Sequence, residues 1–138
     1  MNDVRVSQVG EDGVGFIFSN NIILSIGFGN FHTCDTKEFG VLHNGSTTNM
    51  EVCIINQATE ETPFGREYLL PERMKGYVPV SLLPDLMALV DSIPSNATKK
   101  EHGQDLEDAI SVLINPDDIE AQFRLSSRFA KGDWPRAE

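Results

Sequence analysis

Two short apolar runs joined by a polar turn constrain the fold of this chain more than any other feature. Residues 16–18 and 22–26 are rich in Phe, Ile and Leu, and Ser19-Asn20-Asn21 separates them. Aromatic and β-branched residues on both sides of a three-residue loop containing Asn favour a β-hairpin. The two glycines in residues 27–30 indicate a bulge, or a close approach of the backbone to another group. The segment therefore predicts an antiparallel sheet.

The rest of the first 95 residues continues this pattern. Residues 4–9 predict a first strand, and residues 50–55 predict a strand at the centre of the sheet, because their apolar content is dense. Two short strands are expected on either side of a turn at residues 71–73. A helix is expected over residues 81–93, with Ser81 as its cap and Pro84 in its first turn.

The last 43 residues predict a polar linker followed by helices. Residues 95–104 are polar and are interpreted as a linker, and residues 104–131 predict two helices joined at Asn115-Pro116, with Asn115 as the cap of the second. The fold class expected is α+β: an antiparallel sheet of four to six strands with a packed helix, followed by a C-terminal helical extension. The corresponding units are a β-rich αβ domain at residues 1–95 and the linker with its helical extension at residues 96–138.

The charge of the chain limits its partners. The 138 residues carry a formal net charge of −10 at pH 7. A surface of this sign repels phosphate, so direct binding to nucleic acid or to an anionic membrane is not expected. The first residues lack the basic start and apolar run of a signal peptide, and the longest apolar stretches are too short to span a bilayer. We therefore expect a cytoplasmic protein, and its charge permits a basic partner or a role as a mimic of nucleic acid.

No motif of high specificity indicates catalysis or a cofactor. A zinc site built from His32, Cys34, Asp35, His43 and Cys53 is disfavoured, because their spacing matches no common zinc pattern. A Cys34 nucleophile with His32 or His43 as its base is the nearest candidate chemistry, yet the sequence offers no evident third group to orient the base. Buried free thiols are the favoured interpretation of both cysteines. We expect no catalytic residue, no metal and no cofactor.

A glycine-bearing loop is the candidate site for a small molecule. It consists of Gly27, Phe28, Gly29 and Asn30. Glycines let backbone N–H groups approach a phosphate closely, so sequestration of a signalling nucleotide is one hypothesis for the function. The acidic balance opposes this hypothesis unless local cations compensate, and the sequence offers Arg66, Arg73 and Lys75 for that purpose.

The C-terminal part contains the candidate surface for binding a protein. Its aromatic and arginine side chains, which are typical anchors of interfaces, are Phe123, Arg124, Arg128, Phe129 and Trp134. The same side chains are equally compatible with packing of the tail onto the domain. An association role is favoured, because basic residues gather here on an otherwise acidic chain, and a charge-steered homodimer is one form that this association takes.

The first 95 residues resemble small uncharacterised proteins encoded by tailed bacteriophages. The matching segments are residues 24–31 (LSIGFGNF), 50–54 (MEVCI), 76–78 (GYV) and the apolar helix at 81–93. The chain departs from the pattern at Cys34, which lies three residues after the aromatic residue instead of next to it, and residues 96–138 match no family. The resemblance implies a phage origin, a compact αβ domain and location in the host cytoplasm. It implies no catalytic activity.

Three functional hypotheses follow. The first is a phage-encoded acidic protein that binds a host protein and inhibits or redirects it, with a defence system as the favoured target. The second is the small-molecule sequestering protein, and the third is a thiol-dependent enzyme. A fold-level resemblance does not decide among them.

Overall fold

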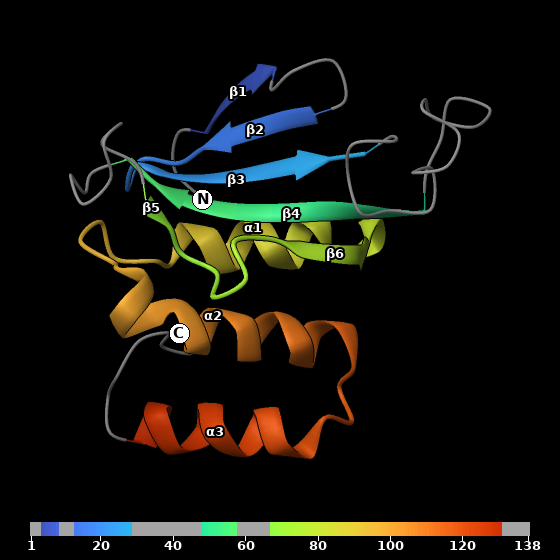
Figure 1. The fold of residues 1–138 in the computed structure, drawn as a ribbon, viewed down its shortest axis with the longest axis vertical. Coiled ribbons are helices and arrows are strands. Elements are labelled where there is room, and N and C mark those ends of the chain that lie inside the picture. Colours follow the sequence, from blue (N-terminus) through green and yellow to red (C-terminus); the bar gives the residue numbers. More distant parts are fainter. Residues whose placement is uncertain (1–3, 9–12, 29–47, 58–66, 131–138) are drawn as a thin grey trace.

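The computed structural model describes residues 4–8, 13–28, 48–57 and 67–130 of the chain. In these residues the fold is α+β, with an antiparallel sheet followed by helices in the C-terminal part (Figure 1). The strands are β1 (Arg5–Gln8), β2 (Gly13–Ile17), β3 (Ile22–Gly27), β4 (Asn49–Asn56), β5 (Glu67–Tyr68) and β6 (Lys75–Pro79). The helices are α1 (Leu83–Asp91), α2 (Lys99–Ile114) and α3 (Ile119–Ala130). The predicted fold class is confirmed.

Strand β4 lies inside the sheet, as the sequence predicts. The order runs from β1 through β2 and β3 to β4, and every pairing is antiparallel. The far edge of β4 is shared, because β5 pairs with its end at Ile55 and Asn56 while β6 pairs with its beginning. The long β4 strand therefore holds both the hairpin strands and the two short strands.

The predicted hairpin is present as β2 and β3. The Phe18 N–H donates to the carbonyl oxygen of Ile22 at 3.0 Å, and the Asn21 N–H donates to the carbonyl oxygen of Phe18 at 3.0 Å. Asn21 has a φ of 66°, in the left-handed region that Asn adopts more readily than most residues. The asparagine-containing turn therefore sets the register of the hairpin.

The core lies between one face of the sheet and the helices. Alternate residues of β3 and β4 point to this face, because successive side chains of a strand alternate. Among them Leu24, Val52 and Ile54 are fully buried. Leu86 of α1 and Leu106 of α2 belong to the same buried cluster. Residues on both sides of the expected boundary at residue 95 thus share one core.

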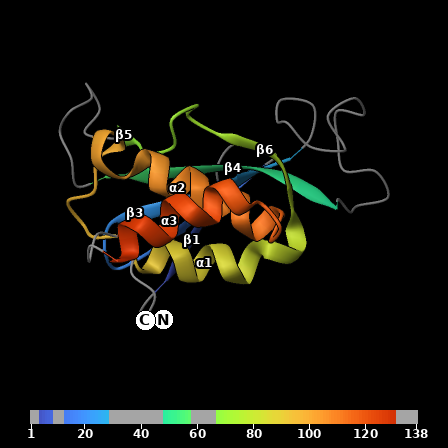
Figure 2. The same ribbon diagram turned by 90° about the horizontal axis from the view of Figure 1, so that it is seen from below.

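Helices α1 and α2 both contribute to the core beneath the sheet, and α3 is the outermost helix (Figure 1). Helix α1 packs on β3, and α3 packs on α2. Figure 1 shows α2 between α3 and the rest of the molecule, and Figure 2, seen from below, shows α3 in front of α2. Helix α3 is therefore attached to the body through α2.

The start of α1 differs from the prediction. Ser81 lies within a 3-10 turn at Val80–Leu82 and does not cap the helix. The N-cap of α1 is Leu82, which makes no side-chain capping hydrogen bond, whereas Pro84 lies in the first turn as predicted. The preceding 3-10 turn leads the chain into the helix, so that a polar cap is not required there.

Helix α2 begins at Lys99, inside the segment 95–104 that the sequence indicates as a linker. The prediction of a linker through residue 104 is therefore wrong. Thr98 is the N-cap, and its Oγ1 accepts a hydrogen bond from the N–H of Glu101 at 3.2 Å. The Lys99 N–H is bound from outside the helix by Oε1 of Glu67, at 3.0 Å. The polar first turn is therefore stabilised by capping and by a strand residue, and hydrophobic periodicity does not reveal it.

The start of α3 also differs from the prediction. Asn115 is the C-cap of α2, and its Oδ1 accepts from the Asp117 N–H at 3.1 Å in the connecting turn. The residue that caps α3 is Asp118, whose Oδ1 accepts from the Ala121 N–H at 3.1 Å. Pro116 lies in the turn and not in the helix. Asn115 and Asp118 are both suitable N-cap residues, and Asp118, which directly precedes the helix, provides the cap.

Two asparagines tie the hairpin end of the sheet to the end of α1. The Asn20 side-chain amide donates to the carbonyl oxygens of Val90 at 2.9 Å and Ile93 at 2.8 Å, and its Oδ1 accepts from the Ile22 N–H at 3.0 Å. Carbonyl groups at a helix C-terminus lack partners within the helix. Asn20, which lies 70 residues before Val90 in the sequence, provides a side-chain donor to the carbonyl groups at and just after the end of α1.

Asn56 makes the corresponding connection one strand away. It pairs with Ile22 in the sheet register and is completely buried. Its side-chain amide donates to the carbonyl oxygens of Ser95 at 3.0 Å and Ala97 at 2.8 Å. The segment between α1 and α2 is thereby fixed to the sheet.

Candidate protein-binding surface

The inner face of α3 is held to α2 by apolar packing and an ion pair. Ala121 is fully buried and Leu125 is 7 % exposed. Arg124 binds Asp108 of α2 through two hydrogen bonds, from Nε to Oδ2 at 2.9 Å and from Nη2 to Oδ1 at 2.7 Å. Asp108 also accepts from the Gln104 side-chain amide at 3.1 Å.

The ion pair is asymmetric in its exposure. The side chain of Asp108 is 2 % exposed, whereas that of Arg124 is 50 % exposed. The hydrogen bond to Asp108 raises the pKa of Arg124 above its ordinary value, so the guanidinium stays charged. Arg124 therefore compensates a buried carboxylate of its own chain while half of its side chain stays exposed.

The outer face of α3 carries two large apolar side chains. Ile119 is 74 % exposed and Phe123 is 76 % exposed. Residues four apart lie one above the other on a helix, so these two side chains form one stripe. Ile114, at the end of α2, is 37 % exposed. We name Ile119 and Phe123 the α3 stripe.

The predicted partner-binding residues lie only partly within the described part of the chain. Phe123 lies in the α3 stripe, and Arg124 binds Asp108. Arg128 and Phe129 belong to the α3 backbone, but their side chains lie outside the described part of the chain, as does the whole of Trp134. Sequence reasoning did not include Ile119 or Asp108 among the site residues. Of these residues only Ile119 has a signal in the sequence, because helical spacing places it away from the apolar face that contains Leu125.

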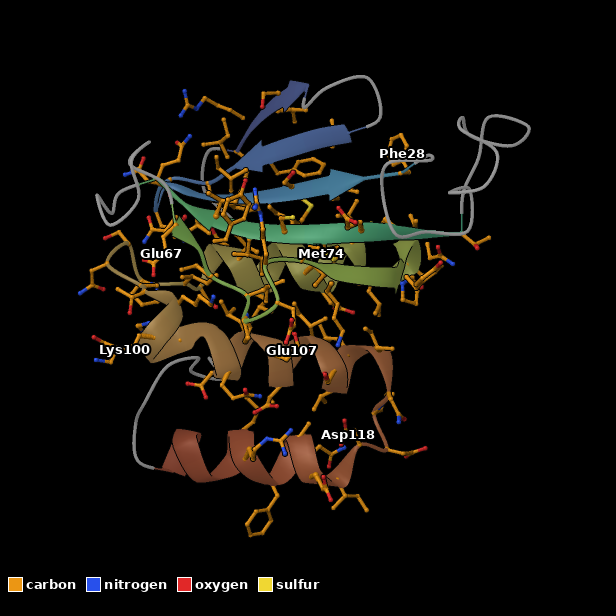
Figure 3. All side chains as sticks on the ribbon, in the orientation of Figure 1. Phe28, Glu67, Met74, Lys100, Glu107 and Asp118 are labelled. Carbon is orange, nitrogen blue, oxygen red and sulfur yellow. The ribbon has the colours of Figure 1, made fainter. Side chains whose placement is uncertain are left out.

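The candidate ligand loop is described only at its beginning. Gly27 is the last residue of β3, where it pairs with Gly13 on one side and Glu51 on the other. Phe28 follows the strand and packs, partly buried, against the core (Figure 3). Gly29 and Asn30 lie outside the described residues.

The cations that the nucleotide hypothesis requires are partly engaged within the chain. The Arg73 guanidinium lies 4.3 Å from the ring centroid of Tyr68. Lys75 forms an ion pair with Glu107, on the side of α2 turned toward β6 (Figure 3). Arg66 lies outside the described residues. Lys75 is therefore neutralised by its own chain, and Arg73 is held against an aromatic ring.

Cys53 does not have the properties of a nucleophile. It is a half-buried free thiol on β4. Burial, together with the negative charge of Glu51, raises the pKa of Cys53 to about 11, although Arg73 lowers it. The reactive form of cysteine is the thiolate, which is scarce at neutral pH with such a pKa. Cys34, His32 and His43 lie outside the described residues. Within the part of the chain that is described, no three His, Cys, Asp or Glu side chains are grouped to hold a metal ion.

Comparison with known proteins adds no family: no protein-family model, curated protein or solved structure matches the chain. Across the residues that the structure describes, none of the helices has the length and apolar character needed to cross a membrane.

Proposed function

We propose that this chain is an acidic binding protein and that the α3 stripe is its contact surface for another protein. The observation that carries the proposal is the exposure of Ile119 and Phe123 on a helix whose opposite face is already packed. Single exposed apolar residues are common on proteins, but two large ones in one helical turn form a surface that association would bury. Burying each side chain contributes about 1.5–3 kcal/mol.

The α2–α3 pair presents this stripe rigidly. Helix α3 is fixed by Ala121, Leu125 and the two hydrogen bonds between Arg124 and Asp108. A contact residue on a helix fixed in advance loses less conformational entropy when it binds. Phe123 is therefore the expected energetic centre of the interface, with Ile119 beside it.

The partner follows from charge and from the resemblance of the first 95 residues to phage proteins. A net charge of −10 favours association with a basic surface and disfavours nucleic acid. We take the partner to be a host protein of basic character, which the chain inhibits or redirects by covering its surface. A protein of a host defence system that itself binds nucleic acid is the favoured target. We assign the chain no catalytic role.

The proposal is tested by capture from bacterial lysate at low salt. The bait proteins are the wild-type chain, Phe123→Ser with Ile119→Ser, and Gln122→Ser as a control on the same helix with the same net charge. All three are expected to have similar stability, because exposed substitutions change the free energy of unfolding by about 0.5 kcal/mol or less. Partners retained by the wild type and by Gln122→Ser, but lost from the double variant, support the proposal.

The affinity for a partner so identified should decrease by at least about thirtyfold for Phe123→Ser, the effect of losing an interface hot spot. Raising the salt concentration should weaken binding further, since screening reduces charge attraction. A partner set that is the same for the double variant contradicts the proposal. If light scattering finds a wild-type dimer that Phe123→Ser converts to monomer, the stripe binds a second copy and the host-protein proposal fails.

A further inference from the structure

Strand β1 forms one edge of the sheet, and among the described residues no other strand pairs with its outer side (Figure 1). An unpaired edge exposes a row of backbone N–H and C=O groups that can pair with another extended segment. Native proteins commonly protect such edges by keeping the strand very short or by interrupting it with a bulge. The two borders of this sheet differ in that protection.

The border opposite β1 has both forms of protection. Strand β5 is only two residues long. Strand β6 is interrupted, because its register with β4 shifts between Met50 and Val52, and Tyr77 at this bulge has a φ of 54°, in the left-handed region. Strand β1 is longer than β5, and it pairs with β2 in one regular register through all four of its residues. The β1 edge is therefore the border at which another strand can be added.

The hairpin contacts fix the direction of the backbone groups of β2. The Phe18 N–H donates to the carbonyl oxygen of Ile22. Hydrogen-bonded and non-bonded residue pairs alternate along an antiparallel ladder, so successive residues turn their N–H and C=O groups in opposite directions. Phe16, two residues before Phe18, therefore also turns these groups toward β3. Ile17 and Gly15 turn theirs toward β1.

The same alternation continues into β1 and leaves its second residue directed outward. Arg5 lies opposite Ile17, and this is a pair of the hydrogen-bonded type. Ser7 stands in the same relation to Gly15. Val6, which lies between Arg5 and Ser7, turns its N–H and C=O away from β2. The outer edge of β1 therefore presents the backbone donor and acceptor of Val6.

The side chain of Val6 ends an apolar row that crosses the sheet on its core face. From the interior to the edge, the registers place side by side Ile54, Leu24, Phe16 and Val6. Exposure increases along this row. Ile54 and Leu24 are completely buried, Phe16 is partly buried, and Val6 is 64 % exposed. A strand added beside β1 would continue the row and cover the Val6 side chain.

We infer that β1 pairs with β1 of a second copy of this chain, in an antiparallel arrangement centred on Val6. In this register the outward backbone groups of the two Val6 residues bind each other, and their side chains meet on the core face of one continuous sheet. Arg5 of each copy then lies opposite Ser7 of the other. A register shifted by two residues would place the two Arg5 side chains opposite each other, which like charges disfavour. The edge is thus complementary to itself, as a twofold interface requires.

The dimer is independent of the α3 stripe. Figure 1 shows β1 and α3 at opposite ends of the molecule, so two chains joined at β1 present two stripes. The paired segment is short, and each chain carries a charge of −10, so the dimer is weak and its two copies repel each other. Because salt screens this repulsion, the dimer should tighten as the salt concentration rises. Binding of a basic partner has the opposite dependence on salt.

Analytical ultracentrifugation of the full chain, from roughly 10 µM to 1 mM, measures the dimer. Val6→Lys places two like charges at the centre of the strand pair, and Val6→Pro removes the outward N–H without adding charge. Each variant should raise the dissociation constant of the dimer at least about tenfold. Gln122→Lys adds the same charge at an exposed position of α3 and should dimerise at least as tightly as the wild type.

Amide hydrogen exchange identifies the strand that pairs. The Val6 N–H should exchange more slowly as the protein concentration rises, whereas the N–H groups of Arg5 and Ser7, already turned to β2, should change little.

A wild-type chain that stays monomeric over the whole concentration range overturns the inference, and so does a dimer that persists in Val6→Lys. That variant decides the question even if Val6→Pro disturbs the fold, because Val6 is exposed. Loss of the dimer in Phe123→Ser also overturns it, since the interface would then be the α3 stripe. Retention of the dimer in Phe123→Ser and its loss in Val6→Lys support the β1 pairing, whether or not a host protein binds the stripe.

Discussion

Replacement of Gly103 by alanine sets two known effects against each other. Gly103 lies in the interior of α2, where alanine is favoured over glycine by about 1 kcal/mol. However, a Cβ built at this position would lie 2.7 Å from the backbone carbonyl oxygen of Leu69, 3.4 Å from Cγ of Lys99 and 3.7 Å from Cδ of Pro71. The Lys99 side chain can move, but a backbone oxygen cannot rotate away.

The steric effect is expected to exceed the gain in helix propensity. To restore an ordinary contact, α2 must move several tenths of an ångström away from Leu69, which is completely buried. The movement loosens the packing of Leu106 and Ile110, which α2 contributes to the same core. Forcing extra volume into a packed core costs about 1–3 kcal/mol, and the upper part of this range, about 2–3 kcal/mol, applies because the atom that the Cβ meets is a backbone oxygen. After the propensity gain of about 1 kcal/mol is subtracted, Gly103→Ala should destabilise the protein by about 1–2 kcal/mol.

Urea denaturation measures this difference directly. A loss of that size lowers the unfolding midpoint by roughly 0.5–1 M urea, with an unchanged slope. Lys100→Ala, an exposed substitution in the first turn of the same helix, serves as the control and should change stability by about 0.5 kcal/mol or less. If Gly103→Ala is as stable as the wild type or more stable, the close approach between α2 and Leu69 is not present as described.

Three further outcomes are expected. Arg124→Ala leaves the buried Asp108 carboxylate without its cation and should lower the urea midpoint, by less than the loss of a fully buried ion pair because the Arg124 side chain is half exposed. Arg124→Lys should recover only part of that loss. Asn20→Asp keeps the shape of the side chain, removes the donors to Val90 and Ile93, and adds a negative charge at the C-terminus of α1. It should lower the free energy of unfolding by about 2–3 kcal/mol, and a variant as stable as the wild type would refute the role of these two hydrogen bonds. Burial raises the pKa of the Cys53 thiol from 9.0 to about 11, so between these pH values the folded state keeps a proton that the unfolded state releases. The stabilising contribution of the protonated thiol is therefore complete below pH 9 and is lost as the pH rises toward 11. Cys53→Ala should remove that alkaline decrease, which thermal unfolding between pH 8 and 11 will show.

Local pattern was sufficient where neighbours in sequence decide the conformation. The apolar runs around Asn20-Asn21 predict β2 and β3, and the dense apolar content of residues 50–55 predicts a strand inside the sheet. The Thr98-x-x-Glu101 spacing is also a local signal, although only the Thr98 half of a capping box is seen in the structure. Hydrophobic periodicity does not indicate this helix start, because the first turn of α2 is polar.

Local pattern was insufficient where two residues compete for one role or where a partner is distant. Asn115 and Asp118 are both acceptable caps, and the turn between α2 and α3 decides in favour of Asp118. Arg124 looks like an interface anchor in the sequence, but α3 packs on α2 so that its guanidinium meets Asp108. An ion pair between helices depends on their rotation about their axes, which the composition of either helix does not specify.

By itself, then, the sequence determined the α+β class, the hairpin and its turn, the interior position of β4 and the net acidity of the chain. These properties depend on short-range propensity, side-chain alternation and total charge, all of which are carried by neighbouring residues or by composition. Only the tertiary structure decided that Asn20 and Asn56 hold the segment around Ile93, that Phe123 is exposed, and that Tyr77 stands in a bulge with a positive φ. Each of these depends on which surfaces meet after the chain has folded, and exposure is a property of the packed whole.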